Sequence, residues 1–109
     1  MEIGFRDSKL QELCEKQAVA ARKLGDPGGR KLRARLAELR AASSVTDLVA
    51  GRPHPLTGDR AGQFGVDLAG GLRLVFAVAD DPVPVKHDGS IDWSLVTAVR
   101  IEFIGDYHD

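Results

Sequence analysis

The stretch RPHPLTGDRAGQFGVDLAGGLRLVFAV, residues 52–78, is the best guide to the fold of the whole chain. Its first nine residues contain two prolines and a glycine, which exclude a helix interior and predict a rigid polar loop. The residues after this loop alternate between apolar and polar on both sides of Gly70-Gly71, the pattern of a β-hairpin. The sequence therefore predicts a polar loop that leads into a hairpin, and loops held by a scaffold commonly carry function.

The chain before this loop has the pattern of two helices. Apolar residues at helical spacing predict a first helix over about residues 9–24, with Ser8 as its N-cap and Gly25 as its end. Asp26-Pro27 then predicts a second start, with an N-cap residue followed by a proline at the first helical position. A second apolar stripe follows, formed by Leu32, Leu36 and Leu39. We expect the two helices to form an αα-hairpin.

The remaining segments have the pattern of strands. Residues 2–6 predict a short first strand, and alternation in the last strand places Val99, Ile101 and Phe103 on one face. In the hairpin the apolar residues should meet the helices, which leaves Arg73 on the opposite face. Residues 80–92 are expected to be an irregular acidic loop. The prediction is an α+β fold, with an N-terminal strand and an αα-hairpin packed on a small twisted antiparallel sheet.

Length and composition limit the alternatives. The 109 residues suit a single domain over 1–109, and an apolar content of 43% is too high for disorder. No apolar run approaches the length of a membrane span, and the single cysteine excludes an internal disulfide. A cytoplasmic protein with no membrane association is the expectation. Cys14 lies in the first apolar stripe, so we interpret it as a small core residue.

The net charge of −1 is unevenly distributed along the chain. Residues 1–60 carry +4 and residues 61–109 carry −5. The arginines of the second predicted helix would suit phosphate contacts, solubility or contacts with a protein partner, and the pattern does not choose among these.

Six side chains form a candidate site for RNA cleavage. Cleavage without a metal requires a base for the ribose 2′-hydroxyl, an acid for the leaving 5′-oxygen, and cations for the phosphate. Histidine suits proton transfer because its pKa lies near neutral pH, and the arginine fork matches phosphate oxygens. A tyrosine can stack on a base. The candidates are His54, Arg60, Arg73, Asp106, Tyr107 and His108.

Each of these residues also has an ordinary structural interpretation. His54, before a proline, would be a plain loop residue, and a terminal Asp-Tyr-His is commonly frayed. No histidine or cysteine spacing resembles a zinc site, and no phosphate-binding glycine loop or redox motif is present, so neither a metal nor a cofactor is expected. His87, in the acidic loop, is left unassigned.

Four features of the sequence together resemble the HigB-type killer toxins of the RelE/ParE superfamily. These are His-Pro-Leu-x-Gly-Asp-Arg at residues 54–60, an aromatic residue in the next strand, Arg73 in the strand after it, and the terminal Asp106-Tyr107-His108. The resemblance covers nearly the whole chain. It implies a RelE/ParE-like fold and an endoribonuclease that cleaves messenger RNA in the ribosomal A site.

The resemblance also implies roles for residues and partners. His54 and His108 would transfer protons, Arg73 would stabilise the phosphate, Asp106 would orient or polarise, and Tyr107 would position the base. Arg52, Thr57 and Arg60 would contact RNA. Thr57 stands where many members have lysine, and Lys86 and Arg52 are the candidates to replace that cation. The implied partners are a cognate antitoxin of the helix-turn-helix type and ribosome-bound mRNA, with operator DNA contacted only through the antitoxin.

Two other functions are open at this point. One is a ParE-like toxin that binds and inhibits DNA gyrase, which the shared superfamily and Thr57 favour. The other is a non-catalytic module that only binds an antitoxin, for which harmless overexpression without the antitoxin would be the evidence.

Overall fold

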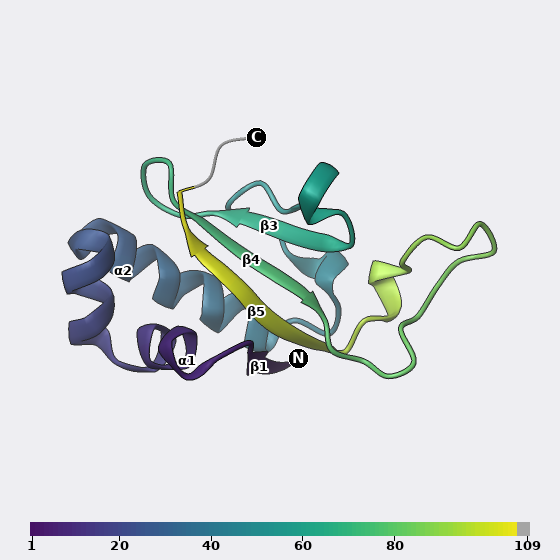
Figure 1. The fold of residues 1–109 in the computed structure, drawn as a ribbon, viewed down its shortest axis with the longest axis horizontal. Helices are drawn as coiled ribbons and strands as arrows, with labels where there is room; N and C mark the ends of the chain where they lie inside the picture. The colour runs from purple at the N-terminus through teal and green to yellow at the C-terminus, as the bar shows by residue number, and fades with distance from the viewer. Residues whose placement is uncertain (107–109) are drawn as a thin grey trace.

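Residues 1–106 form an α+β fold with five strands and two helices, so the predicted fold class is confirmed, while strand β2 was not predicted. The computed structural model describes residues 1–106; Tyr107, His108 and Asp109 lie outside this range. In chain order the elements are β1 Glu2–Phe5, α1 Ser8–Glu15, α2 Gln17–Ala41, β2 His54–Pro55, β3 Gln63–Asp67, β4 Arg73–Val78 and β5 Ala98–Gly105 (Figure 1). Short 3-10 turns lie at η1 Val45–Asp47, η2 Gly58–Arg60 and η3 Trp93–Leu95.

The sheet is mixed rather than purely antiparallel. Its strand order is β1-β5-β4-β3-β2, and β1 runs parallel to β5 while the other neighbours are antiparallel. The expectation of an antiparallel sheet is therefore wrong at one edge. The reason is a long-range pairing, because the first strand docks beside the last one and local hairpin geometry does not set its direction.

The helices begin and break at residues other than those predicted. The N-cap of α1 is Asp7 rather than Ser8, and its carboxylate accepts a hydrogen bond of 2.9 Å from the Leu10 amide. The predicted helix over 9–24 is interrupted at Lys16, whose extended backbone ends α1 and whose carbonyl accepts from the Val19 and Ala20 amides. The predicted break at Gly25 is confirmed by its φ of 78° inside α2.

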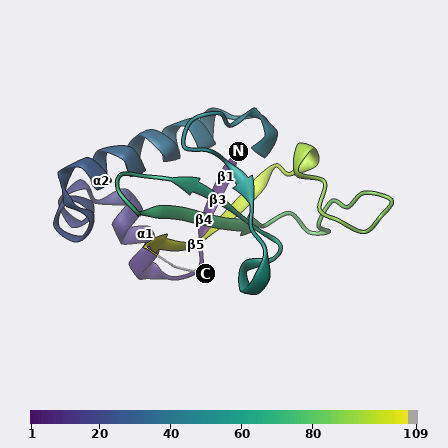
Figure 2. The ribbon, with the colours of Figure 1, turned by 90° about the horizontal axis from the view of Figure 1, so that it is seen from above.

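The core lies between α2 and one face of the sheet. Leu32, Leu36 and Leu39 are each about 99% buried, and they share one hydrophobic cluster with Phe64, Val66, Leu74 and Phe76 from the hairpin. Figure 2 shows α2 on one side of the sheet and the turn of residues 58–60 on the other. Burial of each large apolar side chain contributes roughly 1.5–3 kcal/mol, so this cluster holds the hairpin that carries the candidate site.

A β-bulge in β5 changes which residues face outward. Phe76 pairs with Ile101 but Val75 pairs with Phe103, so Glu102 is an extra residue in the ladder. Phe103 consequently lies on the same face as Val75 and Arg73, whereas the alternation of the sequence predicts that it shares the core face with Ile101. The bulge therefore delivers an aromatic ring to the face opposite α2.

The described helices do not include a membrane-spanning one. Within residues 1–106, no helix is long and apolar enough to cross a bilayer.

Cys14 should be chemically inert in the folded protein. Burial raises the pKa of its thiol to about 12, so almost no thiolate exists at pH 8, in contrast to an exposed cysteine with a pKa of about 8.5. We expect alkylation of the native protein to be at least roughly 100-fold slower than that of the urea-unfolded chain. Mass spectrometry of timed iodoacetamide reactions measures this, and equal rates would show that Cys14 is exposed in solution.

Candidate active site

The loop before β2 is bent by two residues with left-handed backbone. Gly51 has φ 82° and Arg52 has φ 49°, the latter rare for a residue with a side chain. The Gly51 carbonyl accepts a hydrogen bond of 2.6 Å from the Asp67 amide in β3. This contact ties the loop to the sheet and directs the chain into β2.

Asp67 joins two of the predicted site arginines on the face opposite α2. Arg52 donates from Nε to Asp67 Oδ2 at 2.7 Å, and Arg73 Nη1 lies 3.1 Å from Asp67 Oδ1. The Asp67 and Arg73 side chains are 17% and 27% exposed, while Arg52 is 77% exposed. The cluster carries a net charge of +1, with Arg73 held in place and the Arg52 side chain open to solvent. The period-two prediction that Arg73 faces away from the core is confirmed.

His54 is exposed on β2 and is oriented by the loop backbone. Its Nδ1 lies 2.7 Å from the Arg52 carbonyl oxygen. A carbonyl can only accept, so Nδ1 carries the proton and the neutral ring has its lone pair on Nε2. This is the tautomer in which Nε2 can act as a base. In the sheet, His54 pairs with Gly65, two residues before Asp67.

Arg60 lies on the same side of the sheet, where it contacts Gln63 and Phe103. Its Nη1 donates to Gln63 Oε1 at 3.0 Å, and its guanidinium carbon lies 4.6 Å from the centre of the Phe103 ring. A cation over an aromatic face within about 6 Å is attracted by roughly 0.5–2 kcal/mol. Thr57 is exposed at the start of η2, where its carbonyl accepts from the Arg60 amide at 3.2 Å.

The end of β5 runs beside Arg73. Gly105 pairs with Arg73 across the ladder, and the carboxylate of Asp106 lies about 3.1 Å from the position that a Cβ on Gly71 would occupy. The end of β5 therefore brings Asp106 to the hairpin turn beside Arg73, as predicted from the sequence if the last strand lies beside the hairpin. Tyr107 and His108 lie outside the described residues, so their predicted roles stay predictions.

Three residues of this face were not among the sequence candidates. Asp67 had a readable signal, because it alternates with Gln63 on the polar side of β3, and the structure pairs it with Arg73 across the hairpin. Gln63 shares that signal. Phe103 had none, because the bulge that turns it outward depends on how β5 packs against β4.

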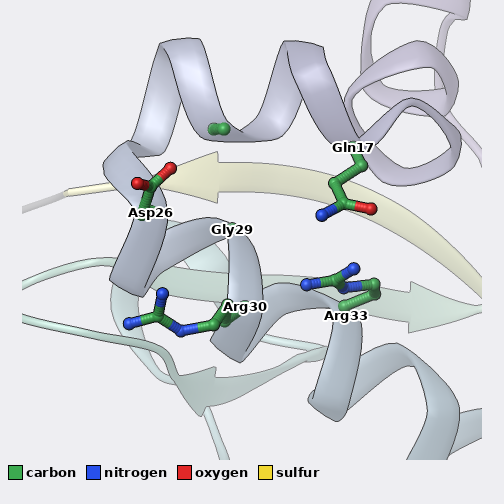
Figure 3. A pocket seen from close by; sticks show the side chains of 6 residues that line it. Gln17, Asp26, Gly29, Arg30 and Arg33 are labelled. Carbon is green, nitrogen blue, oxygen red and sulfur yellow. The ribbon is translucent and has the colours of Figure 1, made fainter.

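Two arginines of α2 line a separate pocket. This pocket has a volume of 280 Å³, and its lining includes Gln17, Asp26, Arg30 and Arg33 (Figure 3). None of the predicted site residues within 1–106 lines it. Arg30 and Arg33 therefore line a pocket that the described site residues do not share.

Acidic and histidine side chains do not gather into a metal site in the part of the chain that is described. Among residues 1–106 no three His, Cys, Asp or Glu side chains are placed to hold an ion together. The described face carries imidazole, guanidinium and carboxylate groups.

Comparison with known proteins gives a likeness of fold. No family model matches the chain, and no curated protein matches its sequence. Among solved structures, a YoeB/ParE toxin from Agrobacterium tumefaciens superposes with a TM-score of 0.62, covering 99% of this chain and all of that one, at 13% identity. At this identity the match concerns the fold, and it does not distinguish HigB-type proteins from other RelE/ParE-like ones. The chain has the α+β fold of a YoeB/ParE-like toxin.

Proposed function

We propose that this protein is the toxin of a type II toxin–antitoxin pair and that it cleaves messenger RNA on the ribosome, as the HigB resemblance implies. The observation that carries the proposal is the hydrogen bond from His54 Nδ1 to the Arg52 carbonyl, 2.7 Å long, next to two arginines that share Asp67. It presents a proton acceptor on the same sheet face as Arg73, which Asp67 holds in place. The likeness to a YoeB/ParE toxin supports the toxin part of the proposal.

The proposed reaction is an attack within the RNA itself. His54 Nε2 takes the proton of the ribose 2′-hydroxyl, the 2′-oxygen bonds to phosphorus, and the bond to the 5′-oxygen breaks. His108 gives that oxygen its proton, so the products are a 2′,3′-cyclic phosphate and a 5′-hydroxyl. Arg73 uses Nη1 for Asp67 and has further donors in its fork for the phosphate. Asp106 orients these groups and Tyr107 positions the base, while Arg52, Thr57 and Arg60 contact the RNA.

Mapping of RNA ends tests this proposal. The wild type and a His54→Ala, His108→Ala double variant would be induced in a bacterium without the antitoxin, and mRNA 5′ ends would be sequenced by a method selective for 5′-hydroxyls. We expect new 5′-hydroxyl ends within coding regions with the wild type and none with the double variant. Absence of new ends with the wild type would refute RNA cleavage.

Inhibition of DNA gyrase is the second candidate. The Asp67 carboxylate offsets one of the two positive charges of Arg52 and Arg73. Thr57 stands where a lysine would add a further positive charge. This face therefore carries less positive charge than RNA cleavage would favour. Intact mRNA together with gyrase-linked DNA breaks in the same experiment would favour this function. Harmless expression would favour a module that only binds an antitoxin.

The proposed partner is an antitoxin encoded beside this protein. A small helix-turn-helix protein in the adjacent reading frame would agree with the proposal, and contact with operator DNA would then occur through that protein alone. Co-expression of the two chains should restore growth.

A further inference from the structure

A hollow of 470 Å³ opens one residue after His54, between the start of β3 and the segment 80–97, which we call the arm. Figure 1 shows the arm extending from the sheet, and it connects β4 to β5. The sequence predicts residues 80–92 of the arm as an irregular acidic loop. The lining residues come from β2, from the start of β3 and from the arm: Pro55, Gly62, Gln63, Lys86, Gly89, Ser90, Ile91 and Trp93.

The arm is held in a defined shape by its own backbone. Val85 and Ile91 form an antiparallel bridge, the Lys86 amide donates to the Ser90 carbonyl at 2.8 Å, and the Gly89 amide donates to the Lys86 carbonyl at 3.0 Å. The Trp93 ring meets Phe64 edge-on at 4.8 Å. The side of the hollow formed by the arm is therefore fixed relative to β3.

The base of the arm is fixed by Asp80. Burial alone would raise the pKa of this carboxyl, but hydrogen bonds from the Thr97 hydroxyl and from the Ala98 and Thr97 amides outweigh it and lower the pKa. These bonds measure 2.7 Å from the hydroxyl and 2.9 Å from the Ala98 amide. The carboxylate thus joins the two ends of the arm where it leaves the sheet.

Two carboxylates of the arm accept hydrogen bonds from its own turns. Asp88 accepts from the Ser90 hydroxyl at 2.6 Å and from the Ser90 amide at 2.9 Å, and Asp92 accepts from the Ser94 amide at 3.2 Å. Hydrogen bonds from Ser90, followed by the charge of Lys86, lower the pKa of Asp88. Within residues 1–106, Lys86 itself forms no ion pair. Its ammonium is the cation of the hollow.

The walls of the hollow suit one nucleotide. Pro55, Ile91 and Trp93 supply apolar and aromatic surface for a base, and Gln63 supplies an amide. Gln63 Oε1 is already bonded to Arg60, whose guanidinium lies over Phe103. Gln63 therefore borders both the hollow and the face that carries His54. Pro55 pairs with the core residue Phe64 and so points to the other side of the sheet from His54, which means that RNA bound at His54 would reach the hollow around the edge strand β2.

We propose that this hollow is a subsite for the nucleotide next to the scissile bond, with the base between Pro55, Ile91 and Trp93 and a phosphate on Lys86. The inference rests on the proposed function and adds a substrate-binding element to it. Lys86 then supplies, from the arm, the cation that Thr57 does not supply from the loop.

Trp93 is the only tryptophan in the chain, so its fluorescence reports on the hollow directly. A short single-stranded RNA would be titrated into the protein in a His54→Ala background, in which the RNA stays intact. We expect quenching of Trp93 fluorescence, and about a tenfold weaker apparent Kd after Lys86→Gln, because one partly screened charge-assisted contact is lost. The slope of log Kd against log salt concentration should fall by about 0.7, the value for one phosphate on a single strand.

Lys31→Gln is the matched control, because it removes the same charge from an exposed position of α2, remote from the hollow. This control should change the apparent Kd less than about twofold. In the ribosome-dependent cleavage assay with His54 restored, Lys86→Gln should raise KM and leave kcat near the wild-type value. A Trp93 signal that does not respond to RNA, or a Lys86→Gln variant that titrates like Lys31→Gln, would overturn the subsite. A wild type that binds but does not cleave on the ribosome would instead refute the proposed function.

Discussion

Replacement of His54 by alanine is expected to lower RNA cleavage by about 10²–10⁴-fold, the usual contribution of a general acid or base. The imidazole is exposed on β2 and its Nδ1 is bonded to the Arg52 carbonyl, so its removal creates no core cavity. The loss should therefore appear in kcat with little change in thermal stability. Cleavage of an mRNA in the A site of programmed ribosomes, followed by primer extension, measures the effect.

His87 provides the matched control for His54. It is the other histidine among the described residues, it is exposed in the arm, and it does not line the hollow beside Lys86. His87→Ala should retain cleavage within about threefold of the wild type, since surface substitutions usually have small effects. Equal activity of the His54→Ala variant and the wild type would remove His54 from the mechanism and leave the fold description unchanged.

Replacement of Gly51 by alanine is expected to destabilise the protein by roughly 2–4 kcal/mol, because a left-handed backbone costs a residue with a side chain about 1–2 kcal/mol and the added atom overpacks its site. A Cβ on Gly51 would lie 2.6 Å from Val66 Cγ1 and 2.8 Å from the Asp67 carbonyl oxygen. One of these atoms belongs to the backbone of β3 and cannot rotate away. The loop must therefore move, which also displaces Arg52 from Asp67 and His54 from its place on β2.

Gly70→Ala separates strain from steric clash. Gly70 has a similar positive φ of 62°, but nothing lies within 4 Å of the position that its Cβ would take. The variant should lose only about 1–2 kcal/mol. Urea unfolding followed by circular dichroism compares the two variants. Equal losses would mean that the contact between the loop and β3 is absent in solution, and the arrangement around Asp67 would have to be abandoned.

Much of the face that carries the candidate site could be predicted because it follows from local periodicity. In the hairpin, alternation places Phe64, Val66, Leu74 and Phe76 in the core and leaves Arg73 outside, and the structure agrees. Two prolines and a glycine were enough to exclude a helix around His54, but the prediction of a loop there is wrong, because His54 and Pro55 pair with β3 as strand β2. The face of the sheet on which a side chain lies depends on its position in its own strand. The alternation of apolar and polar residues therefore predicts that face.

Other features depend on partners that are distant in the chain. The break at Lys16 interrupts a continuous helical pattern, and it coincides with the packing of α1 beside β1 and β5. The parallel pairing of β1 with β5 joins residues nearly a hundred positions apart. No local signal encodes either, because both result from the way apolar faces meet across the whole domain.

By itself, the sequence determined the fold class, the helical and strand halves, the absence of a helix around His54 and the outward direction of Arg73. Only the tertiary structure decided that Asp67 joins two arginines, that a bulge at Glu102 turns Phe103 outward to Arg60, and that the arm forms a hollow beside β2. The physical reason is the separation along the chain between the residues that each effect involves. Periodicity and turn chemistry act over a few residues, whereas register, bulges and hollows arise where strands far apart in the chain pack together.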